Sequence, residues 1–201
     1  MAKQRQTEIA GLDGLAAAVR GQAEGRKGLP PVDRWDPPFC GDLDIRIASD
    51  GTWSYLGSPI GRLPLVRLFA SVIKREGDKY FLVTPVEKIG ITVEDAPFLA
   101  VEMQDEPTAS GRRLHFRTNV DDWVACGAEH VLRFELEQSS GGLKPYLHVR
   151  RNLWAKVTRA LFYDLVEMGE ERDIDGVRMF GIDSNGVFFP MARADGLEGL
   201  I

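Results

Sequence analysis

Cysteine and histidine, the residues that most often hold transition metals, are scarce in this sequence. Its 201 residues include 2 cysteines and 3 histidines. Cys40 and Cys126 form no CxxC pair and have no histidine pair at zinc-site spacing, which excludes the common zinc motifs. We expect both thiols to be reduced and buried, because disulfides are rare in reducing compartments.

Long apolar runs are also missing. No stretch approaches the roughly 20 apolar residues that are needed to cross a bilayer. The first residues, MAKQRQTEIAGLDGLAAAV, lack the apolar centre and the cleavage site of a secretion signal. We therefore expect a cytoplasmic protein that does not insert into a membrane.

The catalytic motifs with a strong sequence signal are absent as well. There is no GxxxxGK(S/T) or GxGxxG phosphate loop, no HExxH helix and no GxSxG turn. His115, His130 and His148 are scattered, and ordinary structural roles account for them. Cys126 and His130 lie four residues apart and would act as nucleophile and base only if a third group oriented the histidine. We assign no catalytic residue, no metal ligand and no cofactor.

Positive charge is in deficit. The net charge of -5 and the pI of about 5.3 argue against general nucleic-acid binding, which needs a basic surface to neutralise phosphates. The content of 44% hydrophobic and 27% charged residues is typical of a folded globular protein.

What is present predicts an α+β fold with two tandem motifs, each of antiparallel strands around one helix. Residues 1–38 contain an amphipathic helix over residues 8–20, followed by an extended connector that is rich in glycine and proline. Residues 39–107 form the first motif and residues 108–191 the second. Residues 192–201 form a tail.

In the first motif, strands are expected at residues 43–47 and 53–55, joined by a turn at Gly51. A helix that starts near Arg62 or Leu63 and continues through Ile73 follows, because its apolar residues fall at helical spacing. Further strands are expected at residues 80–84, 89–93 and 98–103.

The second motif repeats this plan. Strands are expected at residues 113–118, 131–136 and 146–149. A helix capped by Asn152 then carries an apolar stripe from Trp154 to Met168. A hairpin turned at Gly186 completes the motif, and positive φ angles are expected at Gly51 and Gly186. One helix among short strands in each half suggests a duplication.

Several segments resemble the bacterial family catalogued as domain of unknown function 1285. The resemblance covers roughly residues 29–191. The residues that carry it are Leu29 to Val32, Trp35, Pro37 to Asp42, Asp50 to Trp53, Tyr55 to Gly57, Pro59, Ile60, Leu65 to Phe69, Tyr80 to Pro85, Val93 to Phe98, Val149, Arg150, Phe162 and Tyr163.

This resemblance implies two tandem motifs, of which the second is similar to a pleckstrin-homology-like half barrel. It also implies a nucleotide-like ligand between the motifs and a role in signal transduction. No catalytic residues come with it.

The positions of the arginines suggest a binding site. Arg62 lies at the start of the first predicted core helix, and Arg150 and Arg151 directly precede the second. A cation at a helix amino terminus opposes the macrodipole unless an anion lies between them. We expect either a bound anion there or the carboxylates of this acidic protein.

The predicted ligand-binding residues share either a guanidinium or amide group near these helix starts or an aromatic ring that could stack on a base. They are Arg62, Arg150, Arg151, Arg117, Asn119, Trp53 and Tyr55.

The function that these features favour is a non-enzymatic module that binds a small anionic, nucleotide-like ligand between its two motifs, with a role in signal transduction. One alternative is an enzyme that acts on a phosphorylated metabolite, which would need a histidine and carboxylate cluster at the site. Another is a protein-interaction scaffold that uses sheet edges. The sequence specifies neither a cofactor nor a protein partner.

Overall fold

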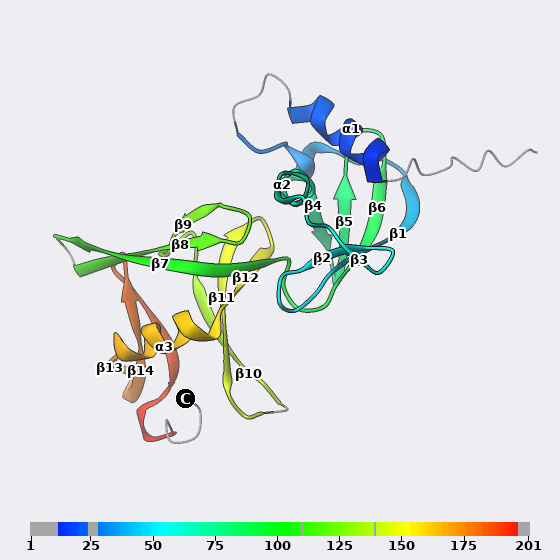
Figure 1. Cartoon of the computed structure of the whole chain (residues 1–201). Helices are drawn as coiled ribbons and strands as arrows, with labels where there is room; N and C mark the ends of the chain where they lie inside the picture. Colours follow the sequence, from blue (N-terminus) through cyan, green and yellow to red (C-terminus); the bar gives the residue numbers. More distant parts are fainter. Residues whose placement is uncertain (1–11, 24–27, 110, 139, 197–201) are drawn as a thin grey trace, which may run out of the picture. The chain divides into compact units, whose positions relative to one another are not determined.

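Two compact units make up the chain, Met1–Asp95 and Ala96–Ile201. The sequence placed the division between residues 107 and 108. It lies earlier because the strand that starts at Phe98 pairs with strands of the second unit. The computed structural model, drawn in Figure 1, describes residues 12–23, 28–109, 111–138 and 140–196.

In its described residues, the first unit contains a six-stranded sheet, here called sheet A, and two α-helices. The part of the predicted first helix that covers residues 8–11 lies outside the described residues. In chain order the elements are α1 (Leu12–Ala23), the short 3-10 helix η1 (Val32–Arg34), β1 (Phe39–Ile47), β2 (Trp53–Tyr55), β3 (Ser58–Pro59), α2 (Leu63–Ala70), β4 (Ile73–Glu76), β5 (Lys79–Val83) and β6 (Lys88–Val93).

The second unit contains a six-stranded sheet B, which curls into a half-barrel, and a three-stranded sheet C. Its elements are β7 (Phe98–Thr108), β8 (Gly111–Thr118), β9 (Trp123–Ala125), β10 (Leu132–Leu136), β11 (Leu143–Arg150), β12 (Leu153–Val157), α3 (Arg159–Glu167), β13 (Glu170–Ile174), β14 (Val177–Ser184), β15 (Val187–Arg193) and the 3-10 helix η2 (Ala194–Gly196). The predicted tail thus begins inside β15.

Sheets A and B have the same strand order. Sheet A runs β3-β2-β1-β6-β5-β4, and sheet B runs β9-β8-β7-β12-β11-β10. In each, two three-stranded antiparallel meanders meet at a central parallel pair, β1 with β6 and β7 with β12. The expectation of purely antiparallel motifs was therefore wrong at the centre of both sheets.

The helices do not occupy equivalent places in this repeat. Helix α2 connects the third and fourth strands of sheet A, whereas α3 follows the sixth strand of sheet B. Helix α2 contacts α1, and α3 contacts β7 and β14. The repeat therefore lies in the strand order and not in the presence of one helix in each half.

The second core helix starts later than the sequence predicted. Residues Leu153–Val157 form β12, with Leu153, Ala155 and Val157 buried on one face, and the helix begins at Arg159. Asn152 lies in the turn before β12 and does not cap a helix. The segment follows the strand period of two instead of the helical period, because β12 pairs on both sides, with β11 and β7. In the first unit, similarly, Ile73 starts β4 and does not continue α2.

The two glycine turns are confirmed. Gly51 has φ 81° and Gly186 has φ 76°, values that a residue without Cβ adopts without strain. Asn185 has φ 53°, so Asn185 and Gly186 form the two-residue turn with positive φ at both positions that joins β14 to β15.

A charged pair lies at one end of sheet B. Arg150, at the end of β11, donates from Nη1 to Oδ2 of Asp122, and its guanidinium stacks 4.7 Å from the ring centroid of Phe98. The side chain of Arg150 is 12% exposed and that of Asp122 is 32% exposed. The pair ties the β8–β9 turn to the end of β11.

None of the described helices combines the length and the apolar character that a membrane span requires.

We predict that Asp122→Asn lowers the free energy of unfolding by about 2 kcal/mol, because a charge-assisted bond to a largely buried guanidinium is weakened. The control is Asp121→Asn. Asp121 pairs with the more exposed Arg117, and asparagine tolerates its positive φ of 66°, so we expect a loss of about 0.5 kcal/mol or less. Urea denaturation measures both values, and equal losses would contradict the prediction.

We also predict that the native protein presents one reactive thiol. Both cysteines are free, but Cys126 is fully buried, and burial raises the pKa of its thiol to about 12. Because the thiolate is the reactive form, a thiol reagent at pH 8 should label Cys40, which is partly exposed. Cys126 should react only in denaturant, and peptide mapping of the labelled chain checks the assignment.

Candidate ligand-binding site

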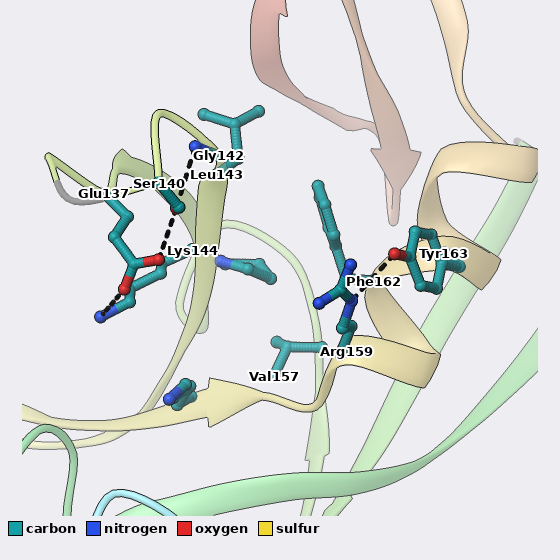
Figure 2. Close-up of a pocket in the computed structure, with 11 residues that line it drawn as sticks. Glu137, Ser140, Gly142, Leu143, Lys144, Val157, Arg159, Phe162 and Tyr163 are labelled. Carbon is teal, nitrogen blue, oxygen red and sulfur yellow. Dashed lines mark hydrogen bonds and ion pairs between the residues drawn. The ribbon is translucent and has the colours of Figure 1, made fainter. Parts of the chain in front are cut away.

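A cavity of about 450 Å³ opens in the second unit, between the β10–β11 loop, β12 and the start of α3 (Figure 2). Its volume falls within the range of small-molecule sites. The residues that line it are Glu137, Ser140, Gly142, Leu143, Lys144, Pro145, Lys156, Val157, Arg159, Phe162 and Tyr163.

The β10–β11 loop forms one wall of this cavity. Glu137 accepts hydrogen bonds from Lys144 Nζ at 2.7 Å and from Ser140 Oγ at 2.6 Å. Both bonds lower the pKa of the Glu137 carboxyl, and the bond from the ammonium group of Lys144 has the larger effect. Ser140 Oγ in turn accepts the backbone N–H of Gly142 at 3.2 Å. The chain can turn this sharply because Gly141 adopts φ 71°.

Helix α3 supplies the opposite wall. Arg159 and Tyr163 are four residues apart, a spacing that places them on one helix face. Arg159 Nε donates to Tyr163 Oη at 2.8 Å, and the guanidinium lies 5.5 Å from the ring centroid of Tyr163. Phe162 is buried, whereas Tyr163 is 41% exposed. This wall therefore offers a guanidinium and an exposed aromatic ring side by side.

The lining is basic. The described residues of the lining include three cations, Lys144, Lys156 and Arg159, and one carboxylate, Glu137. Among the described residues, no carboxylate lies within ion-pair distance of Arg159; its contacts are with Tyr163. Guanidinium and ammonium groups bind phosphate and carboxylate, and the guanidinium does so through two parallel bonds. The arrangement is suited to hold an anion.

The sequence patterns did not indicate this site. Lys156 and Arg159 were assigned to one long helix, whereas Lys156 lies in β12 and Arg159 starts α3. The available signal was the alternation of Leu153, Ala155 and Val157, which predicts a strand, followed by Thr158 as the residue before the helix.

Three of the predicted site residues belong to the first unit. Arg62 is the residue before α2, is 67% exposed and lies 3.6 Å from Asp13. Trp53 is 2% exposed and packs in the core, and Tyr55, two residues further along β2, is half-buried. A base cannot stack on Trp53 in this conformation.

The other four predicted residues belong to the second unit, where the predicted helix start is replaced by a strand turn. Arg150 ends β11 and pairs with Asp122, and Arg151 lies in the turn before β12. Arg117 binds Glu102 at 2.7 Å and Asp121 at 2.8 Å. Asn119 accepts the backbone N–H of Leu99 through Oδ1 at 3.0 Å. Carboxylates of the protein itself thus lie beside Arg62, Arg117 and Arg150. Ligand binding by the seven residues stays a prediction.

The remaining candidates from the sequence have structural contacts. His130 stacks on His148 with ring centroids 5.7 Å apart, and His148 meets the edge of Trp154 at 5.2 Å. Cys126 is buried, so it is not available as a nucleophile in this conformation. In the part of the chain that the structure describes, no group of three or more His, Cys, Asp or Glu side chains is placed to hold a metal ion.

The chain is similar to two solved structures. A structure titled as a DUF1285 family protein from Silicibacter pomeroyi DSS-3 is 45% identical, covers 92% of this chain and 98% of its own, and has a TM-score of 0.81. A second, from Shewanella baltica OS155, is 32% identical and covers 62% of this chain and 91% of its own, with a TM-score of 0.50. No curated protein matches.

Two family models cover the body of the chain. Residues 30–96 match the amino-terminal domain of DUF1285, described as a domain of unknown function, and residues 97–191 match the carboxy-terminal domain. The junction between the models falls one residue from the division between the two structural units. The two models match residues 30–191 without a gap, and the chain therefore belongs to the DUF1285 family.

Proposed function

We propose that this protein is a non-enzymatic binding protein for a small anionic ligand, held in the basic cavity of the second unit. The observation that carries the proposal is the excess of positive charge among the described residues that line that cavity, three cations against one carboxylate, in a chain whose net charge is -5. An acidic protein that gathers cations around a cavity offers an anion a local site that its overall charge does not.

The ligand in this proposal is nucleotide-like. Its phosphate or carboxylate would lie between Lys156 and Arg159, and its ring would stack on the exposed face of Tyr163. Stacking of a base on an aromatic side chain adds about 1–3 kcal/mol. The role in signal transduction and the pleckstrin-homology-like character of the second unit belong to this same proposal.

The ligand-binding residues predicted from the sequence form a competing location for the same ligand. Of these, Arg62 offers the most exposed guanidinium with the longest ion pair, 3.6 Å to Asp13. Variants in the basic cavity and at Arg62 therefore decide which of the two locations binds the ligand.

The test is isothermal titration calorimetry of the full chain with AMP, inorganic phosphate and adenosine. We expect AMP to bind more tightly than either part alone, because only AMP uses both the cations and the ring. Arg159→Gln and Lys156→Gln should each weaken AMP binding about tenfold or more, the loss expected for a charge-assisted contact. Arg178→Gln is the matched control, because Arg178 is 74% exposed, pairs with Glu171 and lies outside the cavity lining.

Absence of binding by all three compounds at millimolar concentration would contradict the proposal. Loss of AMP binding in Arg62→Ala, with Arg159→Gln unchanged, would move the site to the first unit. Hydrolysis of AMP during the titration would favour the alternative of an enzyme that acts on a phosphorylated metabolite.

A further inference from the structure

A second cavity, of about 550 Å³, lies elsewhere in the second unit and has a different charge pattern. The β7–β8 hairpin forms one side, and the end of α3 with β13 and β14 forms the other. Its charged lining residues are Asp105 and Arg112 on the hairpin side, and Glu170, Arg172 and Asp183 on the other.

The side formed by β13 and β14 is negative. Arg172 lies between two carboxylates, with Nη1 3.1 Å from Asp183 Oδ2 and Nη2 bonded to Glu170 Oε1. One guanidinium thus serves two carboxylates, which leaves one negative charge on this side. Carboxylate oxygens have several lone pairs each, so Glu170 and Asp183 retain the capacity to accept further hydrogen bonds.

The hairpin side presents a guanidinium whose hydrogen bonds are incomplete. Arg112 Nε lies 3.6 Å from Asp105 Oδ2, which is longer than a hydrogen bond. Arg112 Nη1 is buried, and it has no hydrogen-bond partner among the described residues. The Arg112 side chain as a whole is 34% exposed, so an acceptor supplied by a ligand can reach its exposed part.

The backbone holds the two sides in place. The carbonyl of Arg112 accepts the N–H of Asn185 at 2.8 Å, and Ser184 Oγ accepts the N–H of Leu114 at 2.9 Å. These bonds fix the backbone of the hairpin to the end of β14, so the two sides of the cavity are held together without the ligand.

We infer that this cavity binds a small aliphatic amino acid in its zwitterionic form. The ligand carboxylate binds the guanidinium of Arg112, and its ammonium group binds Glu170 and Asp183. Pro107, Met168 and Ile182 supply the apolar part of the lining, against which the aliphatic side chain packs. A simple anion would meet three carboxylates here and a simple cation would meet two guanidinium groups, so a ligand that carries both charges fits best.

The experiment is calorimetric titration of the full chain with L-leucine, L-isoleucine, L-valine and L-methionine, each in turn. Two analogues of leucine, 4-methylpentanoate and 3-methylbutylamine, carry one of its two charges each. We expect at least one amino acid to bind, and to bind about tenfold or more tightly than the analogues that lack one charge.

Arg112→Gln should weaken amino-acid binding about tenfold or more, and Glu170→Gln is the second variant on the opposite side. The control is Arg193→Gln, because Arg193 lies on the neighbouring β15, is 63% exposed and pairs with Asp195 outside the lining. Circular dichroism verifies that each variant is folded.

The inference is overturned if none of the four amino acids binds, if a singly charged analogue binds as tightly, or if folded Arg112→Gln and Glu170→Gln both bind like the wild type. Arg159→Gln, in the basic cavity, should leave amino-acid binding unchanged. The two sites therefore succeed or fail independently of each other.

Discussion

The first and the sixth strand of each six-stranded sheet run parallel to one another at its centre. In sheet A this pairs Ile47 with Val93, and in sheet B it pairs Val157 with Ala100. The flanking meanders form from strands that are close in sequence, but the central pairs join segments separated by most of a unit. Closing such long connections costs chain entropy that only the packed sheet recovers. Without the central pair, each sheet would fall into two three-stranded ribbons.

The same pairing positions the basic cavity. Strand β12 is held between β7 and β11, and the N–H of Thr158 continues the ladder by donating to the carbonyl of Ala100. The helix can start only where this ladder stops, so Arg159 faces the cavity from the first position of α3. Lys156 reaches the cavity from the end of β12, the strand that precedes this helix. A long-range contact between strands thus determines where the cations of a local loop and helix meet.

Local chemistry was predictable from the sequence, and pairing partners were not. The turns at Gly51 and Gly186 followed from residues that tolerate positive φ, and the buried positions of β1 followed from alternation. The start of α3 did not follow, because an apolar residue every third or fourth position fits the stretch from Trp154 to Met168 as a helix, although β7 makes its first part a strand. The predicted site did not include Arg159 for that reason, because the binding role of a cation depends on the residues that the fold places opposite it.

Parallel alignment of β1 and β6 also determines how the first unit responds to force. Phe39 lies beside Lys88 and Ile47 beside Val93, so the chain enters the pair at one end and leaves it at the other. A pull on the start of β1 and the end of β6 loads all the hydrogen bonds of the pair in shear at once. The two strands must slide along each other before any bond is released. An antiparallel hairpin pulled at its open end would lose its bonds one after another. We therefore expect the unit to resist mechanical extraction, such as threading by an unfolding protease, more strongly than a hairpin that opens one bond at a time.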